Sequence, residues 1–359
     1  AHDQEVCASL EQAQKHLDEL DPRRQNTIDT EEGVSRRKAM ALLISTPSAL
    51  FGMAQAHGSH SAVLHPQETL SLSTVSIPLC WQLYFEGGFS ELEQLLPGYL
   101  AQLSALGLQS SPYQKKAARL AAQAQQLACL LALQRQDFGT ALKHARDALK
   151  HGQTAEDANL QLAATVRYAY IYFCLKQHEQ CFHMYSQQGL AYQEDCSPLL
   201  RGFLYASLAE TYAGRGEQDP ALEYLRRAYD IFPQRPEDDS NFSYTHFRRL
   251  TLDNLEGQVY LHLKQPRQAW EAFLRVDRAA PPIPYKLAVT IHKAATMLAL
   301  NEMEPACSLL ECAATTALAF GSSLRYSEAY TVYRQIQDTW RHERPVKALQ
   351  ELFYRNLFL

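Results

Sequence analysis

Glycine and proline are scarce in this sequence, with 15 and 16 among 359 residues, and they are sparse outside turns. Alanine, leucine, glutamine, glutamate and arginine recur throughout, and these residues have high helix propensity. Hydrophobic residues make up 46% of the chain and charged residues 20%, which is typical of a folded protein rather than a disordered one. The composition therefore predicts a helical, folded protein.

The sequence also lacks an excess of positive charge, since its formal net charge is −5. A chain built mainly to bind nucleic acid usually carries a basic face. We therefore expect no direct nucleic-acid binding and no membrane partner. At 359 residues the chain exceeds one ordinary core, so it forms either two domains or a repeat array that needs no single core.

No two of the eight cysteines form a C-x-x-C pair. Most lie inside helical patterns, at positions that a small apolar residue would fill. We expect buried free thiols in a reducing cytosol, with a disulfide framework as the alternative. The cysteines are Cys7, Cys80, Cys129, Cys174, Cys181, Cys196, Cys307 and Cys312.

The common motifs of catalysis and nucleotide binding are missing. The sequence contains no G-x-x-x-x-G-K-[ST], G-x-G-x-x-G, G-x-S-x-G or H-E-x-x-H pattern, and its carboxylates are scattered singly. His57, His60 and His65 lie close enough to bind a metal ion, but they read better as part of a solvated linker. We expect no enzyme, no catalytic residue, no cofactor and no metal site.

The most regular stretch is residues 202–235, GFLYASLAETYAGRGEQDPALEYLRRAYDIFPQR. Small residues stand where two antiparallel helices would cross, large ones fill the space beside them, and a proline ends the second helix. Counted from Gly202 within a 34-residue unit, positions 8, 11, 20, 24, 27 and 32 carry Ala209, Tyr212, Ala221, Leu225, Ala228 and Pro233. This is the signature of a tetratricopeptide repeat (TPR).

The same pattern recurs along most of the chain. Position 20 of successive units is small, at Ala141, Cys181, Ala221, Ala269 and Ala306. Hairpins are predicted over residues 77–106, 113–151, 157–192, 202–235, 247–281 and 286–319, and a closing helix pair over 323–340 and 343–357. The fold class is therefore all-α, a right-handed α-solenoid of about six to seven TPR-like hairpins.

The two ends of the chain carry weaker signals, and they divide it into three parts. N-terminal helices (4–20 and 36–44) and a linker occupy residues 1–76, with 54–76 as a loop. The TPR array spans 77–321, and capping helices span 322–359. Residues 35–38 (SRRK) open an uncharged run that resembles a twin-arginine export signal, although a helix followed by a linker is the default.

Two further segments leave alternatives open. The acidic residues 235–244 are predicted to connect two repeats, although Glu237, Asp238 and Asp239 could bind calcium. The final helices carry more apolar residues than a free end usually shows, at Leu349, Leu352, Phe353, Leu357 and Phe358. These residues either pack back on the sixth repeat or form a homodimer contact.

Partner binding is predicted on the first helix of each hairpin, at the positions that turn toward the groove. Asn and Gln can satisfy both the donor and the acceptor of an extended backbone, Arg can pair with a carboxylate, and Tyr supplies stacking area. The alternative for any one of them is a solvated or inter-repeat contact. The candidates for peptide or protein binding are Gln126, Arg167, Tyr170, Glu210, Asn254, Gln258 and His292.

Beyond the repeats, the chain resembles the C-terminal sensor regions of bacterial XRE-type helix-turn-helix transcriptional regulators. The segments that carry the resemblance are LCWQLYFEGGFSELEQLLPGYLAQLSAL (79–106), SPLLRGFLYASLAETYA (197–213), FPQRPEDDSNFSY (232–244), GSSLRYSEA (321–329) and WRHERPVKALQELF (340–353). The resemblance implies a cytoplasmic module that senses a ligand or peptide, similar to quorum-sensing receptors with a short peptide in the TPR groove.

One departure from that family affects the expected partners. Residues 1–34 are too short and too acidic to be a DNA-binding domain, so either the chain is a fragment or the protein signals through a partner. The leading hypothesis is a non-catalytic scaffold that binds a peptide or protein segment in its concave groove. The alternative is a regulatory partner module of an effector enzyme, a protease or nuclease, in bacterial defence.

Overall fold

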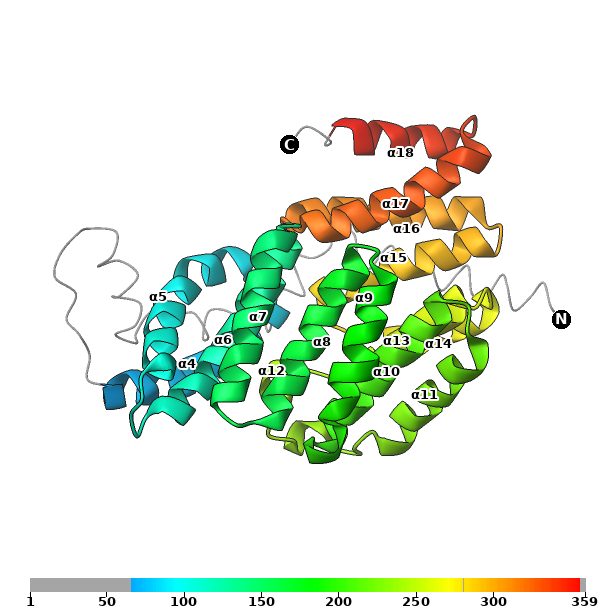
Figure 1. Ribbon diagram of the computed structural model, residues 1–359. Helices are drawn as coiled ribbons and strands as arrows, with labels where there is room; N and C mark the ends of the chain where they lie inside the picture. The colour runs from blue at the N-terminus through cyan, green and yellow to red at the C-terminus, as the bar shows by residue number, and fades with distance from the viewer. Residues whose placement is uncertain (1–65, 280, 356–359) are drawn as a thin grey trace.

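The computed structural model describes residues 66–279 and 281–355, and in this part of the chain every regular element is helical. Seven pairs of consecutive helices follow one another (Figure 1). They are α4 (Pro66–Phe85) with α5 (Phe89–Leu108), α6 (Gln114–Gln134) with α7 (Phe138–Thr154), α8 (Ala158–Cys174) with α9 (His178–His183), α10 (Pro198–Gly214) with α11 (Gln218–Ile231), α13 (Arg249–His262) with α14 (Pro266–Arg278), α15 (Ile283–Ala299) with α16 (Met303–Ala319), and α17 (Ser323–Trp340) with α18 (Arg344–Arg355). The prediction of an all-α solenoid of TPR-like hairpins is confirmed.

Small side chains let the paired helices approach each other, as the repeat pattern predicts. All five residues at position 20 are completely buried. In the fifth pair, a Cβ added to Gly257 would lie 2.4 Å from a carbon of the Phe273 ring. Since real Cβ atoms do not come that close, the two helices can only cross here over a glycine.

The turns and helix ends follow ordinary local chemistry. Asp137, Asp157, Ser197 and Ser322 each accept a hydrogen bond at a helix N-terminus, from the backbone N–H three residues ahead. Most of the short turns contain one residue in the left-handed conformation, which ends the preceding helix. These residues are Gly87, Gln136, Glu156, Lys176, Gly216, Lys264, Asn301 and Gly321.

The first helix begins earlier than the sequence predicts. Residues 66–76 belong to α4, which continues through Pro78, so the expected loop is wrong over these residues. The apolar pattern explains why the helix extends, because Leu70 and Ile77 are both buried. Pro78 lies inside the helix, and the burial of the flanking turns outweighs the hydrogen bond that the proline removes.

The third and fourth pairs contain irregular segments. After α9 the chain forms a single π-helical stretch, η2 (Met184–Gly189), followed by a short 3₁₀ turn, η3 (Gln193–Asp195). The acidic segment after α11 holds η4 (Pro236–Asp238) and α12 (Phe242–Thr245). Here the Asp239 carboxylate accepts hydrogen bonds from the backbone and side chain of Asn241. The segment is therefore a connection built into the fold, as predicted.

The array turns back on itself, because the last pair contacts the second pair, which is hydrogen-bonded to the first at the same place. Ser322, at the start of α17, donates a 2.6 Å hydrogen bond from Oγ to Oε1 of Gln134 at the end of α6. The Gln134 amide in turn donates to the Tyr84 hydroxyl of α4 at 2.9 Å. Phe85 of α4 also stacks on His246, which follows α12, with ring centroids 3.9 Å apart. These contacts join segments up to 188 residues apart in the sequence.

The apolar residues of the C-terminal helices pack within the chain. Leu349 and Phe353 of α18 are buried, and the Phe353 ring stacks on Tyr333 with centroids 4.9 Å apart. They pack back on the preceding helices, as one of the two alternatives predicts. A homodimer through these helices stays a prediction, and Leu357 and Phe358 lie outside the described residues.

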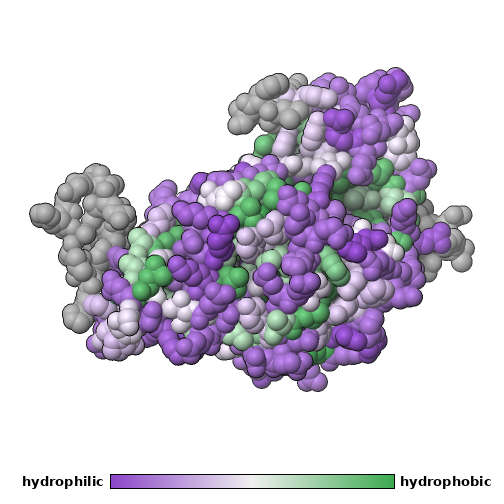
Figure 2. Space-filling model, in the orientation of Figure 1, coloured by the Kyte–Doolittle hydropathy of each residue, from purple (hydrophilic) through white to green (hydrophobic). Residues whose placement is uncertain are grey.

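The surface seen in Figure 2 is mostly hydrophilic, with apolar patches between the polar ridges. Among the described helices, none combines the length and apolar composition that crossing a membrane requires. Five of the seven described cysteines are buried thiols, and Cys174 and Cys312 are half-buried. The predicted N-terminal helices, the twin-arginine pattern, the three clustered histidines and Cys7 lie outside the described residues.

Candidate functional site

The first helices of the pairs form an inner layer. Each packs on the first helix of the next pair, and α17 returns to contact α6 (Figure 1). The side chains on the inward side of this layer, which we call the inner face, come from α4, α6, α8, α10, α13, α15 and α17. Helices enclose the inner face on several sides. Water therefore screens the charges there less than on an open surface, and their interactions are stronger.

Arg167 of α8 is an inner-face cation without an acidic partner among the described residues. Its guanidinium lies over the rings of Trp81 on α4 and Phe203 on α10, at 5.9 and 5.7 Å from their centroids. The side chain is half-buried, and desolvation lowers the pKa of Arg167 from its usual value. Two aromatic faces stabilise the cation, but they leave its N–H donors free for an anion.

Trp81 adds a second free donor beside this guanidinium. The residue is completely buried, and its indole Nε1 has no hydrogen-bond partner among the described residues. Buried polar atoms are nearly always paired, since an unpaired one costs about 1–3 kcal/mol. The region around Arg167 therefore holds unused hydrogen-bond donors.

Glu210 of α10 is the reverse case, a buried acceptor without a donor. Its side chain is only 7% exposed, and Oε1 has no hydrogen-bond partner among the described residues. Burial, together with the charge of Glu328 on α17, raises the pKa of Glu210 to about 8. This carboxyl is protonated at neutral pH unless a cation comes close enough to stabilise the carboxylate.

Arg325 and Glu328 bring α17 into the same region. Arg325 Nη1 donates a 2.7 Å hydrogen bond to Glu328, and the two side chains are 19% and 30% exposed. Burial opposes the charge of Arg325, but Glu328 raises its pKa above the usual value. The charges of this pair also act on the pKa of Tyr170 and Cys174 of α8, so α17 faces α8 across the interior.

A smaller polar group occupies α13 and α15. Asn254 Oδ1 lies 3.0 Å from His292 Nδ1, and the imidazole packs on the Phe273 ring with centroids 5.9 Å apart. Burial lowers the pKa of His292 to about 3, so the ring is neutral and its Nδ1–H donates to the amide oxygen. The structure thus pairs two predicted site residues with each other.

The predicted site residues fall into three groups. Arg167 and Tyr170 stand on α8, and Glu210 stands on the neighbouring helix α10. The charge of Glu210 raises the pKa of Tyr170, and Tyr170 in turn acts to raise the pKa of Arg167. Asn254 and His292 form the second group. Gln126 is completely buried with both amide atoms unpaired among the described residues, and Gln258 is half-buried. No described contact joins these two glutamines to the others.

Sequence reasoning missed Trp81, Arg325 and Glu328. They lie in the first and last pairs, where the repeat pattern is weak and predicts no groove positions. Arg325 and Glu328 stand within GSSLRYSEA, a segment whose resemblance to the regulators implies no particular site residue. Contact between α17 and α8 depends on closure of the whole array, and a pattern within one repeat carries no signal for that.

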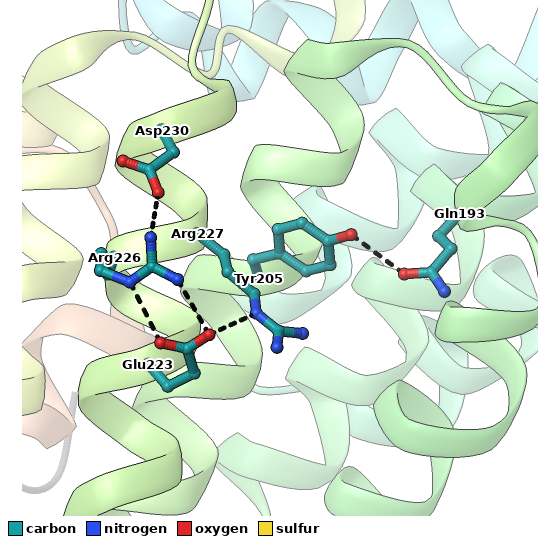
Figure 3. Close-up of polar contacts among 6 residues, drawn as sticks. All are labelled: Gln193, Tyr205, Glu223, Arg226, Arg227 and Asp230. Carbon is teal, nitrogen blue, oxygen red and sulfur yellow. Dashed lines mark hydrogen bonds and ion pairs between the residues drawn. The ribbon is translucent and has the colours of Figure 1, made fainter.

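The second helices of the pairs form the outer face of the array, and on one of them, α11, the charged side chains are paired. On α11, Glu223 accepts hydrogen bonds from both Arg226 and Arg227, and Arg226 also pairs with Asp230 (Figure 3). These four side chains are 42–61% exposed. Hydrogen bonds from the two arginines lower the pKa of Glu223 to about 2. These charges of α11 are paired with each other, whereas Arg167 and Glu210 on the inner face have no charged partner among the described residues.

Within residues 66–279 and 281–355, no group of three His, Cys, Asp or Glu side chains is arranged to hold a metal ion. No protein-family model matches the sequence, and no curated protein matches it. The crystal structure of the APC/C hetero-tetramer Cut9-Hcn1 resembles the fold with a TM-score of 0.39 and 15% identity. The match covers 91% of this chain but 64% of that chain, and at this TM-score it carries no argument about function.

Proposed function

We propose that the chain is a non-catalytic scaffold that binds a peptide, or an extended segment of a protein, against its inner face. The observation that carries the proposal is a set of inner-face polar groups without partners in the described part of the chain, at Arg167, Trp81 and Glu210. A fold that used these groups only for stability would pair them, as it does on the outer face. A bound polypeptide supplies both donors and acceptors along its backbone and can satisfy them.

In this proposal the chain is the sensing part of a bacterial regulator that works in the cytoplasm. The closed arrangement supports that role, since a ligand on the inner face touches several first helices at once. Binding there favours one curvature of the array over others, and a ligand can shift such an equilibrium only through its different affinity for the two states. The signal then passes to another domain or to a partner protein.

Capture of bound peptides tests the proposal. The purified chain is incubated with lysate of its source, washed and denatured, and the released peptides are identified by mass spectrometry. An inner-face variant, Arg167→Gln with Asn254→Ala, is compared with an outer-face variant, Arg226→Gln with Arg227→Gln. We expect the inner-face variant to lose the peptides that the wild type and the outer-face variant retain. Retention of the same peptides by all three proteins contradicts the proposal.

A further inference from the structure

The inner face contains a cation and a carboxyl group that are close to the same side chains but not paired with each other. Arg167 has Tyr170 and Tyr185 among its electrostatic neighbours. Glu210 acts on the pKa of the same two tyrosines. No hydrogen bond or ion pair joins Arg167 to Glu210, and neither residue affects the pKa of the other.

Leaving Arg167 and Glu210 unpaired costs the protein free energy when no ligand is bound. An enclosed guanidinium and an enclosed carboxyl stabilise each other when they pair, and each is destabilised when it is left apart. Here the guanidinium is held between two aromatic rings, and the carboxyl keeps a proton at neutral pH. A ligand that carries one negative and one positive charge can stabilise the guanidinium and the carboxylate at the same time.

The separation of the two groups along α10 suits a short peptide. Arg167 lies over the ring of Phe203, and Glu210 stands seven residues further along the same helix, about 10 Å away at a rise of about 1.5 Å per residue. An extended peptide gains about 3.3 Å per residue, so three to five residues span roughly 10–17 Å. Tyr170 and Tyr185 lie near both charges and offer ring faces to the peptide between its ends.

We propose that the inner face binds a short peptide with free termini, holding its carboxylate at Arg167 and its ammonium group at Glu210. The inference rests on the proposed function and adds the charges and the length of the ligand. When the ammonium group binds, Glu210 releases its proton to solvent, and the bound cation offsets the repulsion between the ionised Glu210 and Glu328.

Four pools of pentapeptides test this assignment. All are drawn from Ala, Leu, Phe, Ser and Asn, so that the termini carry the only charges. One pool has both termini free, one is acetylated, one is amidated and one is blocked at both ends. Retention of each pool by the full chain is measured by equilibrium dialysis and mass spectrometry. We expect the free pool to bind at least tenfold more tightly than any blocked pool.

Single variants identify which residue recognises which end. With Arg167→Gln, the free pool should bind no better than the amidated pool, because the carboxylate has lost its partner. With Glu210→Gln, it should bind no better than the acetylated pool. Arg167→Lys keeps the charge and should recover part of the preference for a free carboxylate. Arg226→Gln on the outer face is the control and should behave as the wild type does.

Two results overturn the inference. If all four pools bind equally, the chain binds peptides without reading their termini, so the proposed function stands and this inference fails. If no pool binds, the inference also fails, and the lysate capture decides the proposed function independently. Variants that lose affinity for every pool are checked by circular dichroism melting. A variant that melts like the wild type but has lost its preference for the free pool supports the assignment.

Discussion

Glu210 gives the protein a pH dependence that can be worked out from one residue. In the folded state the carboxyl has a pKa of about 8, whereas in the unfolded chain it ionises near the ordinary value of 4.5. Between these values the folded state binds one more proton, so the free energy of unfolding decreases as pH rises. The slope is about 1.4 kcal/mol per pH unit.

The histidines restrict the range in which this effect is visible. His246 and His292 have pKa values lowered by burial to about 4 and about 3, so they add stability as pH rises toward 6.5. The effect of Glu210 is therefore clearest between pH 6.5 and 8. The other groups that face it do not titrate in that range in the folded state, and they are Tyr170, Cys174, Cys181, Tyr185 and Arg325.

We expect the wild type to lose about 2 kcal/mol of unfolding free energy between pH 6.5 and 8, and Glu210→Gln to lose much less. Urea unfolding at the two pH values measures both. Glu223→Gln on the outer face is the matched control, because the pKa of Glu223 is about 2 and lies far below this range. An equal loss in wild type and Glu210→Gln would show that other groups set the pH dependence.

At the scale of the elements, the crossing of α13 and α14 depends on the absence of a side chain at Gly257. We expect Gly257→Ala to lower the free energy of unfolding by about 1–3 kcal/mol, because the new methyl group meets the buried Phe273 ring. Gly214→Ala is the control, since nothing lies within 4 Å of a Cβ there, and alanine is the better helix former. Thermal melting compares the two, and equal stability of both variants is the result that contradicts the account.

Two neighbouring residues of the C-terminal helix α18 test whether it packs within the chain or forms an interface between chains. Phe353 is completely buried, so Phe353→Ala should cost about 3–5 kcal/mol and speed hydrogen exchange throughout α18. The neighbouring Tyr354 is 43% exposed, and Tyr354→Ala should change little. Light scattering gives the mass of each protein. A wild-type dimer that Phe353→Ala converts into a stable monomer would mean that the residue serves an interface instead.

The helix pairs were predictable because each one is a local pattern. Ala141, Ala221 and Ala269 mark helix crossings that involve residues within a single unit, and all three are fully buried. The start of α4 was missed because residues 66–76 carry no mark of the repeat pattern, and α4 packs on the helices that follow it. Local sequence predicts an element well when its partners lie within the same repeat.

The candidate site was predictable only in part for the same reason. Arg167 and Glu210 occupy groove positions of their own units, and the repeat numbering places them on the inner side. Their environment comes from Trp81 and Glu328, which belong to the first and last helix pairs. The numbering also selected Gln126, which is completely buried, because position within a repeat does not report how closely the neighbouring helices pack.

At the scale of the whole molecule, closure of the array makes the inner face a surface that is enclosed by helices. The hydrogen bonds from Ser322 to Gln134 and from Gln134 to Tyr84 join three helix pairs. A ligand that reaches Arg167 and Glu210 contacts α8 and α10 and lies close to α17, which carries Glu328. The central claim is therefore about location: the ligand binds inside the closed array and not along its outer helices.

Hydrogen–deuterium exchange with and without the free-termini pentapeptide pool tests that location most directly. We predict slower exchange in α8, α10 and α17 when the pool is bound, and unchanged exchange in the outer helices α7 and α11. Glu210→Gln should weaken the effect at α10, and Arg226→Gln should leave the whole pattern intact. Slower exchange confined to α7 and α11, with α8 and α10 unaffected, would contradict the account.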